Sequence, residues 1–151
     1  MRPSPRNVAL LVCCVAGLGV SIYLTLTHYT KAVSLVCSNN GAINCEKVTT
    51  SPQSVVFGIP VAVLGLIFFV SMLVLSLPRI YQRPELGIAR LRLASSVVGI
   101  GFVFYLLYSE LFVIHAICLW CSSVHILTFI IFCLVVTGWS EVTGYDEEDE
   151  L

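Results

Sequence analysis

The chain has 151 residues, of which 58% are hydrophobic and only 11% are charged, and its formal net charge is -1. A mean hydropathy of +0.95 excludes an ordinary soluble globular domain. The lack of a basic block excludes a typical nucleic-acid-binding protein. We therefore expect an all-α membrane protein that forms one domain over residues 1–151.

The first apolar stretch, about residues 8–29, follows Arg2 and Arg6 and is long enough to cross a membrane. About 20 helical residues, at about 1.5 Å each, span a hydrocarbon core of about 30 Å. Basic residues before an apolar run also resemble a signal peptide. This run is longer than the usual signal sequence and lacks a clear small-residue cleavage site. The sequence therefore predicts a retained membrane helix.

The second apolar stretch, about residues 55–77, is preceded by Ser51-Pro52. Serine is a favourable helix N-cap, and proline at the first helical position loses no hydrogen bond. The second helix is therefore predicted to begin at this pair. Pro60 removes one backbone hydrogen bond, so we expect it to kink or loosen the first turns of this helix.

Two further spans are predicted at about residues 93–113 and 117–138, followed by an acidic tail at 141–151 that we expect to be solvated and disordered. Four spans form a four-transmembrane-helix bundle and put both termini on one side of the membrane. Small residues in the spans permit close helix packing: Ala16, Gly17, Gly19, Gly65, Ser95, Ser96, Gly99 and Gly101.

Basic residues predict the orientation of the bundle. Only Lys31 and Lys47 lie in the connection Thr30–Ser54, between the first and second spans. The other six Lys and Arg residues precede the first span or lie between the second and third, and the positive-inside rule assigns them to the cytoplasm. The termini and the acidic tail are then cytoplasmic, and the connection forms an outer loop. The six are Arg2, Arg6, Arg79, Arg83, Arg90 and Arg92.

Four of the seven cysteines lie at the outer boundary, where disulfides persist: Cys37 and Cys45 in the loop, and Cys118 and Cys121 at the start of the fourth span. On a helix, Cys118 and Cys121 lie one turn apart on one face. The positive end of the helix dipole favours a thiolate, so we expect Cys118 to be the more reactive and Cys121 the more buried. The other three cysteines are expected to be packing residues inside spans: Cys13, Cys14 and Cys133.

Two thiol pairs on one side of a membrane indicate electron transfer between a soluble protein and a carrier dissolved in the lipid. Two alternatives stay open. The four thiolates could form a structural zinc site, although the oxidising compartment counts against it, and no metal is expected. Two disulfides could also staple the loop of a non-catalytic membrane scaffold.

The order of these motifs resembles the vitamin K epoxide reductase family. It is most similar to prokaryotic four-helix members that reoxidise periplasmic thiol oxidases of the DsbA type, a DsbB-like activity. The matching features cover most of the chain. They are Cys37 and Cys45 with seven residues between them, Ser51 six residues after Cys45, Phe57-Gly58-Ile59-Pro60, and Cys118-Leu119-Trp120-Cys121.

The resemblance implies a four-helix bundle around a quinone of the ubiquinone, menaquinone or vitamin K type, capped by the cysteine-bearing outer loop. Cys121 would donate electrons to the quinone, Cys118 would exchange with Cys45, and Cys37 would meet a soluble thioredoxin-like or DsbA-like partner. Ser51 and Phe57 would lie near the quinone. The implied activity is that of a quinone-dependent thiol-disulfide oxidoreductase that supports disulfide-bond formation.

Two departures qualify the resemblance. Animal members have a longer loop and a tyrosine at the position of His125, which weakens the case for vitamin K epoxide as substrate; an epoxide or quinone reductase is kept as an alternative. Several bacterial members carry a fused thioredoxin-like domain. Because none follows the fourth span in this sequence, we expect the partner to be a separate polypeptide.

Four polar residues are candidates for contacts with the quinone, because reducing a quinone requires two protons. Glu110 and His115 lie near the outer end of the third span, His28 lies near the outer end of the first, and His125 lies one turn below Cys121. Each could also sit in the wet interface without a role. Trp120 and Tyr108 fit an aromatic belt or a ring-stacking wall equally well.

Overall fold

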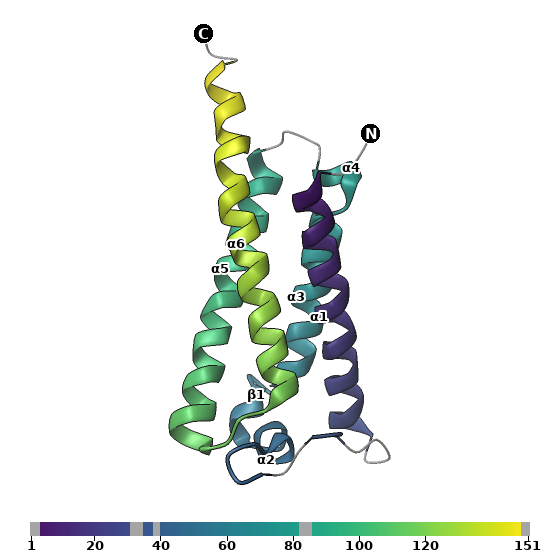
Figure 1. Ribbon diagram of the computed structural model, residues 1–151, viewed down its shortest axis with the longest axis vertical. Helices are drawn as coiled ribbons and strands as arrows, with labels where there is room; N and C mark the ends of the chain where they lie inside the picture. Colours follow the sequence, from purple (N-terminus) through teal and green to yellow (C-terminus); the bar gives the residue numbers. More distant parts are fainter. Residues whose placement is uncertain (1–3, 31–34, 38–39, 82–85, 149–151) are drawn as a thin grey trace.

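The computed structural model describes residues 4–30, 35–37, 40–81 and 86–148, and these form a bundle of long helices. Helices α1 (Pro5–Tyr29), α3 (Val61–Leu75), α5 (Leu86–Tyr108) and α6 (Leu119–Glu148) run lengthwise and pack in a closed ring in that order (Figure 1). The start of α1 and the end of α6 lie at one end, and the short helix α2 (Cys45–Thr49) lies at the other (Figure 1). The predicted all-α fold is confirmed.

Three helical segments among the described residues are long and apolar enough to cross a membrane. They are Pro5–Tyr29, Leu86–Ile114 and Leu119–Trp139, with hydropathies of 2.3, 2.1 and 2.3. Helix α3 is apolar but has only 15 residues, or about 22 Å of helix, less than a hydrocarbon core of about 30 Å. The first, third and fourth expected spans therefore correspond to full-length helices, and the second corresponds to a shorter one.

The second helix does not begin at Ser51-Pro52. Pro52–Ser54 form a single 3-10 turn (η1), and the chain then makes a small antiparallel hairpin of β1 (Val55–Val56) and β2 (Ile59–Pro60). Valine and isoleucine are apolar, but their β-branched side chains also favour extended backbone over helix. Their apolar character was therefore no evidence for helix at these positions.

Phe57 and Gly58 form the two-residue turn of this hairpin, with φ angles of 53° and 78°. Positive φ at both turn residues is the geometry that matches the twist of a tight hairpin, and glycine adopts it freely. Pro60 is the last extended residue and the N-cap of α3. It therefore precedes the helix and does not kink it.

Helix α6 extends well past the predicted end of the fourth span at residue 138 and continues through Glu148. The expectation of a disordered tail over 141–151 is thus wrong for most of that segment. The last three residues, 149–151, lie outside the described residues.

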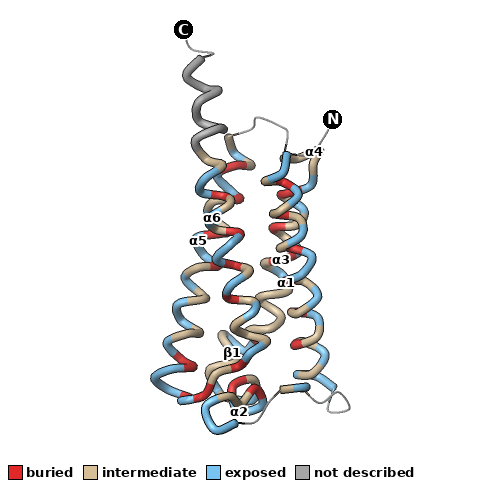
Figure 2. Tube along the Cα trace, in the orientation of Figure 1, coloured by how far each residue is buried: buried red, intermediate tan, exposed pale blue. Residues whose placement is uncertain are grey.

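Buried residues lie along the length of the bundle (Figure 2), and the apolar ones form two separate cores. One core, formed by α1, α3 and α6, lies toward the start of α1; the other surrounds α2. Cys14, with 0% exposure, lies in the first core and Cys13 packs against it, as expected for packing residues, whereas Cys133 is exposed on α6. The buried members of the first core are Leu10, Cys14, Phe69, Met72, Ile131 and Val135.

Polar contacts close the bundle at the end where α1 starts. The Nδ2 of Asn7, on α1, donates to the carbonyl of Ser76 at 2.7 Å, and Arg92, on α5, donates to the carbonyl of Leu75 at 3.0 Å. These carbonyls belong to the C-terminus of α3, where helical backbone partners run out. Arg92 also stacks 4.5 Å from the ring centroid of Tyr81, in the short helix α4 (Pro78–Tyr81).

Candidate active site

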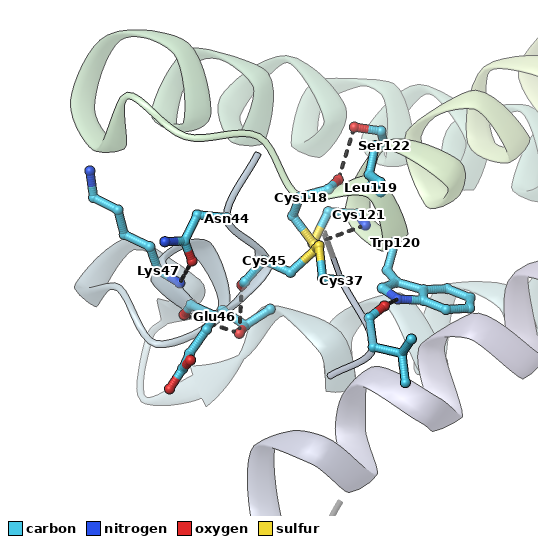
Figure 3. Close-up of a disulfide and its surroundings, with 12 residues drawn as sticks. Cys37, Asn44, Cys45, Glu46, Lys47, Cys118, Leu119, Trp120, Cys121 and Ser122 are labelled. Carbon is cyan, nitrogen blue, oxygen red and sulfur yellow. Dashed lines mark hydrogen bonds between the residues drawn. A yellow bond between two sulfur atoms is a disulfide. The ribbon is translucent and has the colours of Figure 1, made fainter. Parts of the chain in front are cut away.

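The structure brings the four boundary cysteines together at the opposite end of the bundle (Figure 3). Cys37 and Cys45 form a disulfide with their Cα atoms 6.0 Å apart, whereas Cys118 and Cys121 are free thiols. Cys45 and Cys118, 1% and 0% exposed, belong to one buried cluster, and Cys37 and Cys121 pack at its edge. One closed and one open cysteine pair thus lie in contact.

Backbone hydrogen bonds set Cys45 beside Cys118. The N–H of Ile117 donates to the carbonyl of Ala42 at 2.9 Å, and the N–H of Asn44 donates to the carbonyl of Ile117 at 3.1 Å. The side chain of Asn44 then caps α2 by accepting from a backbone N–H at 2.9 Å. Asn44 directly precedes Cys45, and Ile117 directly precedes Cys118. The hydrogen bond between them therefore places Cys45 and Cys118 next to each other in the buried cluster.

Cys118 occupies the N-terminus of α6, as the sequence predicted. Its sulfur accepts a hydrogen bond from the backbone N–H of Cys121 at 3.3 Å, the position of an N-cap acceptor. The pKa of Cys118 is lowered, first by the hydrogen bond that the Cys121 thiol donates and then by the N–H groups of Cys121 and Trp120; burial and the nearby Glu110 oppose this. Cys118 is therefore the favoured thiolate of the pair.

Burial of the inner pair differs in part from the expectation. Cys118 has no exposed surface, because α2 covers it, whereas Cys121 keeps some accessible surface. The accessible surface of Cys121 borders a cavity between the helices. The two thiols thus face different surroundings: Cys118 faces the loop disulfide, and Cys121 faces the cavity.

The cavity has a volume of about 480 Å³ and lies between the two cores, largely between α3 and α5. This size lies in the usual range of small-molecule sites, about 300–1,000 Å³. Its walls are mainly apolar, with polar groups at several positions along its length. The polar residues that line it include Ser51, Gln53, Ser54, Ser95, Ser109, Glu110, His125 and Thr128.

Two buried polar side chains in this lining flank Cys121. His125 is 5% exposed, and its Nδ1 has no hydrogen-bond partner among the described residues. Glu110 is 4% exposed, and its carboxylate lies near the backbone N–H of Cys118. A buried polar atom without a partner is costly, so a ligand that carries a hydrogen-bonding oxygen would fit beside His125.

A π-helical segment places Glu110 beside the thiols. Helix α5 continues as η2 (Ser109–Ile114), which ends at His115 in the left-handed conformation, φ 53°. The N–H of Ala116 then donates to the carbonyl of Glu110 at 3.1 Å. This tight reversal brings Cys118 back against Glu110. The sequence predicted a short turn here but not the π-helix. Single π-helical turns within α-helices are often found at functional sites.

The other predicted contact residues fall into two groups. Ser51 lines the cavity while its Oγ donates to the carbonyl of Val48 at 2.7 Å, and the exposed His28 lies at the rim. Phe57 is 99% exposed at the hairpin tip, and His115 is exposed at the end of η2; neither lines the cavity. The structure therefore brings Ser51, Glu110 and His125 to the cavity but not Phe57 or His115.

The chain matches the model of a known protein family. The family model described as Vitamin K epoxide reductase family matches residues 8–136, well over half of the chain. The matched region contains all four boundary cysteines and the polar lining of the cavity.

Proposed function

The chain belongs to the vitamin K epoxide reductase family, and from this premise we propose that it is a membrane thiol:quinone oxidoreductase. It would oxidise a soluble thioredoxin-like protein, reduce a quinone and thereby support disulfide-bond formation. One observation carries the proposal: the open pair Cys118 and Cys121 contacts the loop disulfide on one side and an apolar cavity on the other.

Burial supports an order for the first exchange. Cys37 is half-buried and Cys45 is 1% exposed, so an incoming thiolate reaches the Cys37 sulfur more easily. Its attack forms a partner–Cys37 bond, breaks the Cys37–Cys45 bond and releases Cys45 as a thiolate. The partner's second thiol then attacks the partner sulfur. The partner leaves with a disulfide, and the loop pair keeps two electrons.

The inner exchange starts from an oxidised Cys118–Cys121 pair. The Cys45 thiolate attacks Cys118, which forms a Cys45–Cys118 bond and releases Cys121. Cys37 then attacks Cys45, which re-forms the loop disulfide and frees Cys118. The two electrons now reside on the inner thiols. This final arrangement, with the loop pair closed and the inner pair reduced, is the one found in the structure.

The cavity suits a quinone, which accepts two electrons and two protons and leaves as a hydroquinone. The apolar walls from α3 and α5 would hold the ring beside Cys121, and His125 Nδ1 offers an unused hydrogen-bonding atom. Glu110 contacts Cys118 and lines the same cavity, so it is placed to take a thiol proton. The overall reaction converts a partner dithiol and a quinone into a partner disulfide and a hydroquinone.

The basic residues support an orientation for this reaction. Arg6, Arg79, Arg90 and Arg92 lie at the end where α1 starts, which would be cytoplasmic. The cysteine end would then face the outer, disulfide-permissive compartment. A membrane-impermeant maleimide applied to intact cells after mild reduction should label Cys37. Labelling that requires permeabilised cells would reverse the orientation.

A trapping experiment tests the relay order. Replacing Cys37 and Cys121 by serine leaves Cys45 and Cys118, which should form a mutual disulfide that mass spectrometry of digested protein detects. The matched control replaces Cys45 and Cys121, leaving Cys37 and Cys118. More efficient cross-linking in the control would overturn the order.

A rescue experiment tests the activity itself. The chain, expressed in bacteria that lack their own quinone-linked thiol oxidase, should restore oxidation of a secreted thioredoxin-like protein. Rescue should fail for Cys118→Ala and for Cys121→Ala at unchanged expression. Rescue by both variants would refute the relay and leave the scaffold interpretation. Turnover of vitamin K epoxide, but not of a partner dithiol, by purified protein would favour the alternative reductase.

A further inference from the structure

The segment that leads to Cys37 is held from both sides of its backbone at Val36. The N–H of Val36 donates to the hydroxyl of Tyr23 at 3.1 Å, and its carbonyl accepts from Nε1 of Trp120 at 3.0 Å. The two aromatic rings also contact each other, with centroids 4.9 Å apart and planes at 57°. Figure 3 shows the indole of Trp120 beside this segment and Cys37. Val36 is thus clasped between α1 and the first turn of α6.

This clasp is polar and not hydrophobic. The side chain of Val36 is 78% exposed, so burial contributes little to its position. Leu35 and Cys37 are only partly buried at the edge of the cluster around α2. Within the described residues, the Leu35–Cys37 segment is therefore held mainly by the two hydrogen bonds and by the disulfide itself.

The disulfide cannot hold Cys37 throughout the reaction. In the proposed relay, it opens when the partner attacks and closes again when Cys37 displaces Cys118 from Cys45. The second step is fast only if the Cys37 thiol stays near Cys45 while no bond joins them, because an intramolecular attack depends on effective concentration. Another tether is needed during this interval.

We propose that Tyr23 and Trp120 form a latch on Val36 that keeps Cys37 in position while the loop disulfide is open, an inference that rests on the relay proposed above. Both are positioning residues, since their side chains act on Cys37 through the backbone of Val36. Trp120 is one of the two residues between Cys118 and Cys121, so the latch ties the Cys37 segment directly to the turn that carries the inner pair.

The latch predicts a lower effective concentration of Cys37 toward Cys45 when either hydrogen bond is lost. Tyr23→Phe and Trp120→Phe keep aromatic rings in place but remove the hydrogen-bonding atoms. One neutral hydrogen bond corresponds to a change of roughly 2- to 12-fold in an equilibrium constant. We expect each variant to lower the equilibrium constant for closing the loop disulfide by roughly that factor.

This constant is measured on the full-length chain in lipid nanodiscs, with Cys118 and Cys121 replaced by serine so that the loop pair exchanges by itself. Equilibration with glutathione buffers, acid quenching, alkylation and mass spectrometry give the closed fraction. Tyr81→Phe and Trp139→Phe are the matched controls, since both residues lie toward the end of the bundle opposite the loop. Constants equal to the controls in both latch variants would overturn the proposal.

A fluorescence measurement tests the latch without disturbing it. The chain has two tryptophans, so Trp139→Phe leaves Trp120 as the sole reporter. When the loop disulfide is reduced, the Trp120 emission maximum should stay where it was, because the latch holds. A shift to the emission of a water-exposed indole would overturn the proposal. Neither measurement uses quinone or partner. If the latch holds but the protein does not oxidise a partner, the proposed relay is wrong and the latch is not.

Discussion

Replacing Gly99 by alanine is expected to reshape the cavity while the bundle stays folded. An alanine Cβ at this position on α5 would lie 2.8 and 2.9 Å from two ring atoms of Phe68 and 3.2 Å from Cγ2 of Thr128. Carbon atoms in good contact are about 3.5–4.0 Å apart. The Phe68 ring therefore has to move by about 0.7–1 Å, and all three residues line the cavity.

The size of the effect follows from this crowding. Overpacking costs about 1–3 kcal/mol, and about 1.4 kcal/mol corresponds to a factor of ten in binding. The crowded atoms are the far end of a side chain that borders open space, so the ring can yield at the low end of this range. We expect quinone binding to weaken by about 5- to 10-fold. Alanine's better helix propensity, up to about 1 kcal/mol, offsets much of the cost to stability.

The assay follows quinone reduction by absorbance, with a reduced thioredoxin-like protein as electron donor. The apparent KM for quinone should rise in Gly99→Ala, while partner exchange at the loop disulfide stays unchanged. Gly101→Ala is the matched control, because nothing lies within 4 Å of a Cβ at that position on the same helix. Equal KM values in the two variants, or slower partner exchange in Gly99→Ala, would refute the reasoning.

Three further predictions concern stability and pH. Gly17→Ala would put its Cβ 2.1–2.5 Å from ring atoms of the fully buried Phe69. It should lower the free energy of unfolding by about 3 kcal/mol, measured by thermal unfolding in detergent. The control Gly19→Ala should not destabilise the protein, because nothing lies within 4 Å of a Cβ at that position. Asn7→Ala strands a buried carbonyl at the end of α3 and should cost about 1–3 kcal/mol, and an unchanged melting temperature would contradict this. Because the pKa of Cys118 is lowered from 9.0, its thiolate forms at lower pH than an ordinary one. The alkylation rate of Cys118, quantified by mass spectrometry, should thus be half-maximal below pH 9.0. The pH of the half-maximal rate should rise in Cys121→Ala, which lacks the thiol that hydrogen-bonds to Cys118. A half-maximal rate at or above pH 9.0 in the unmodified chain would contradict the prediction.

Length and apolarity were enough to predict three of the helices. A hydrocarbon core requires only a long run of apolar residues with its backbone bonded internally, and both properties are local to the chain. The N-cap position of Cys118 was also predictable, because the boundary between a polar turn and an apolar run marks a helix start. The hairpin at Val55–Pro60 was not, since apolar residues there satisfy a strand as well as a helix.

The candidate site likewise has features that the sequence could predict and features that it could not. The four cysteines could be named from their spacing, and His125 and Glu110 from their places near Cys121. Their surroundings could not be named, because these depend on which helices face one another. Phe57, for example, matched a motif yet lies fully exposed on a turn.

The sequence by itself determined the helical membrane fold and singled out the four candidate redox cysteines, because hydrophobic length and cysteine spacing are properties of short segments. Only the tertiary structure decided that Cys118 faces the loop disulfide and Cys121 faces a cavity, and that Trp120 bonds to Val36 rather than serving only as an interface aromatic. That last contact joins residues 84 positions apart. No local pattern encodes such a pairing, since it exists only once α1, α2 and α6 have packed around a common end.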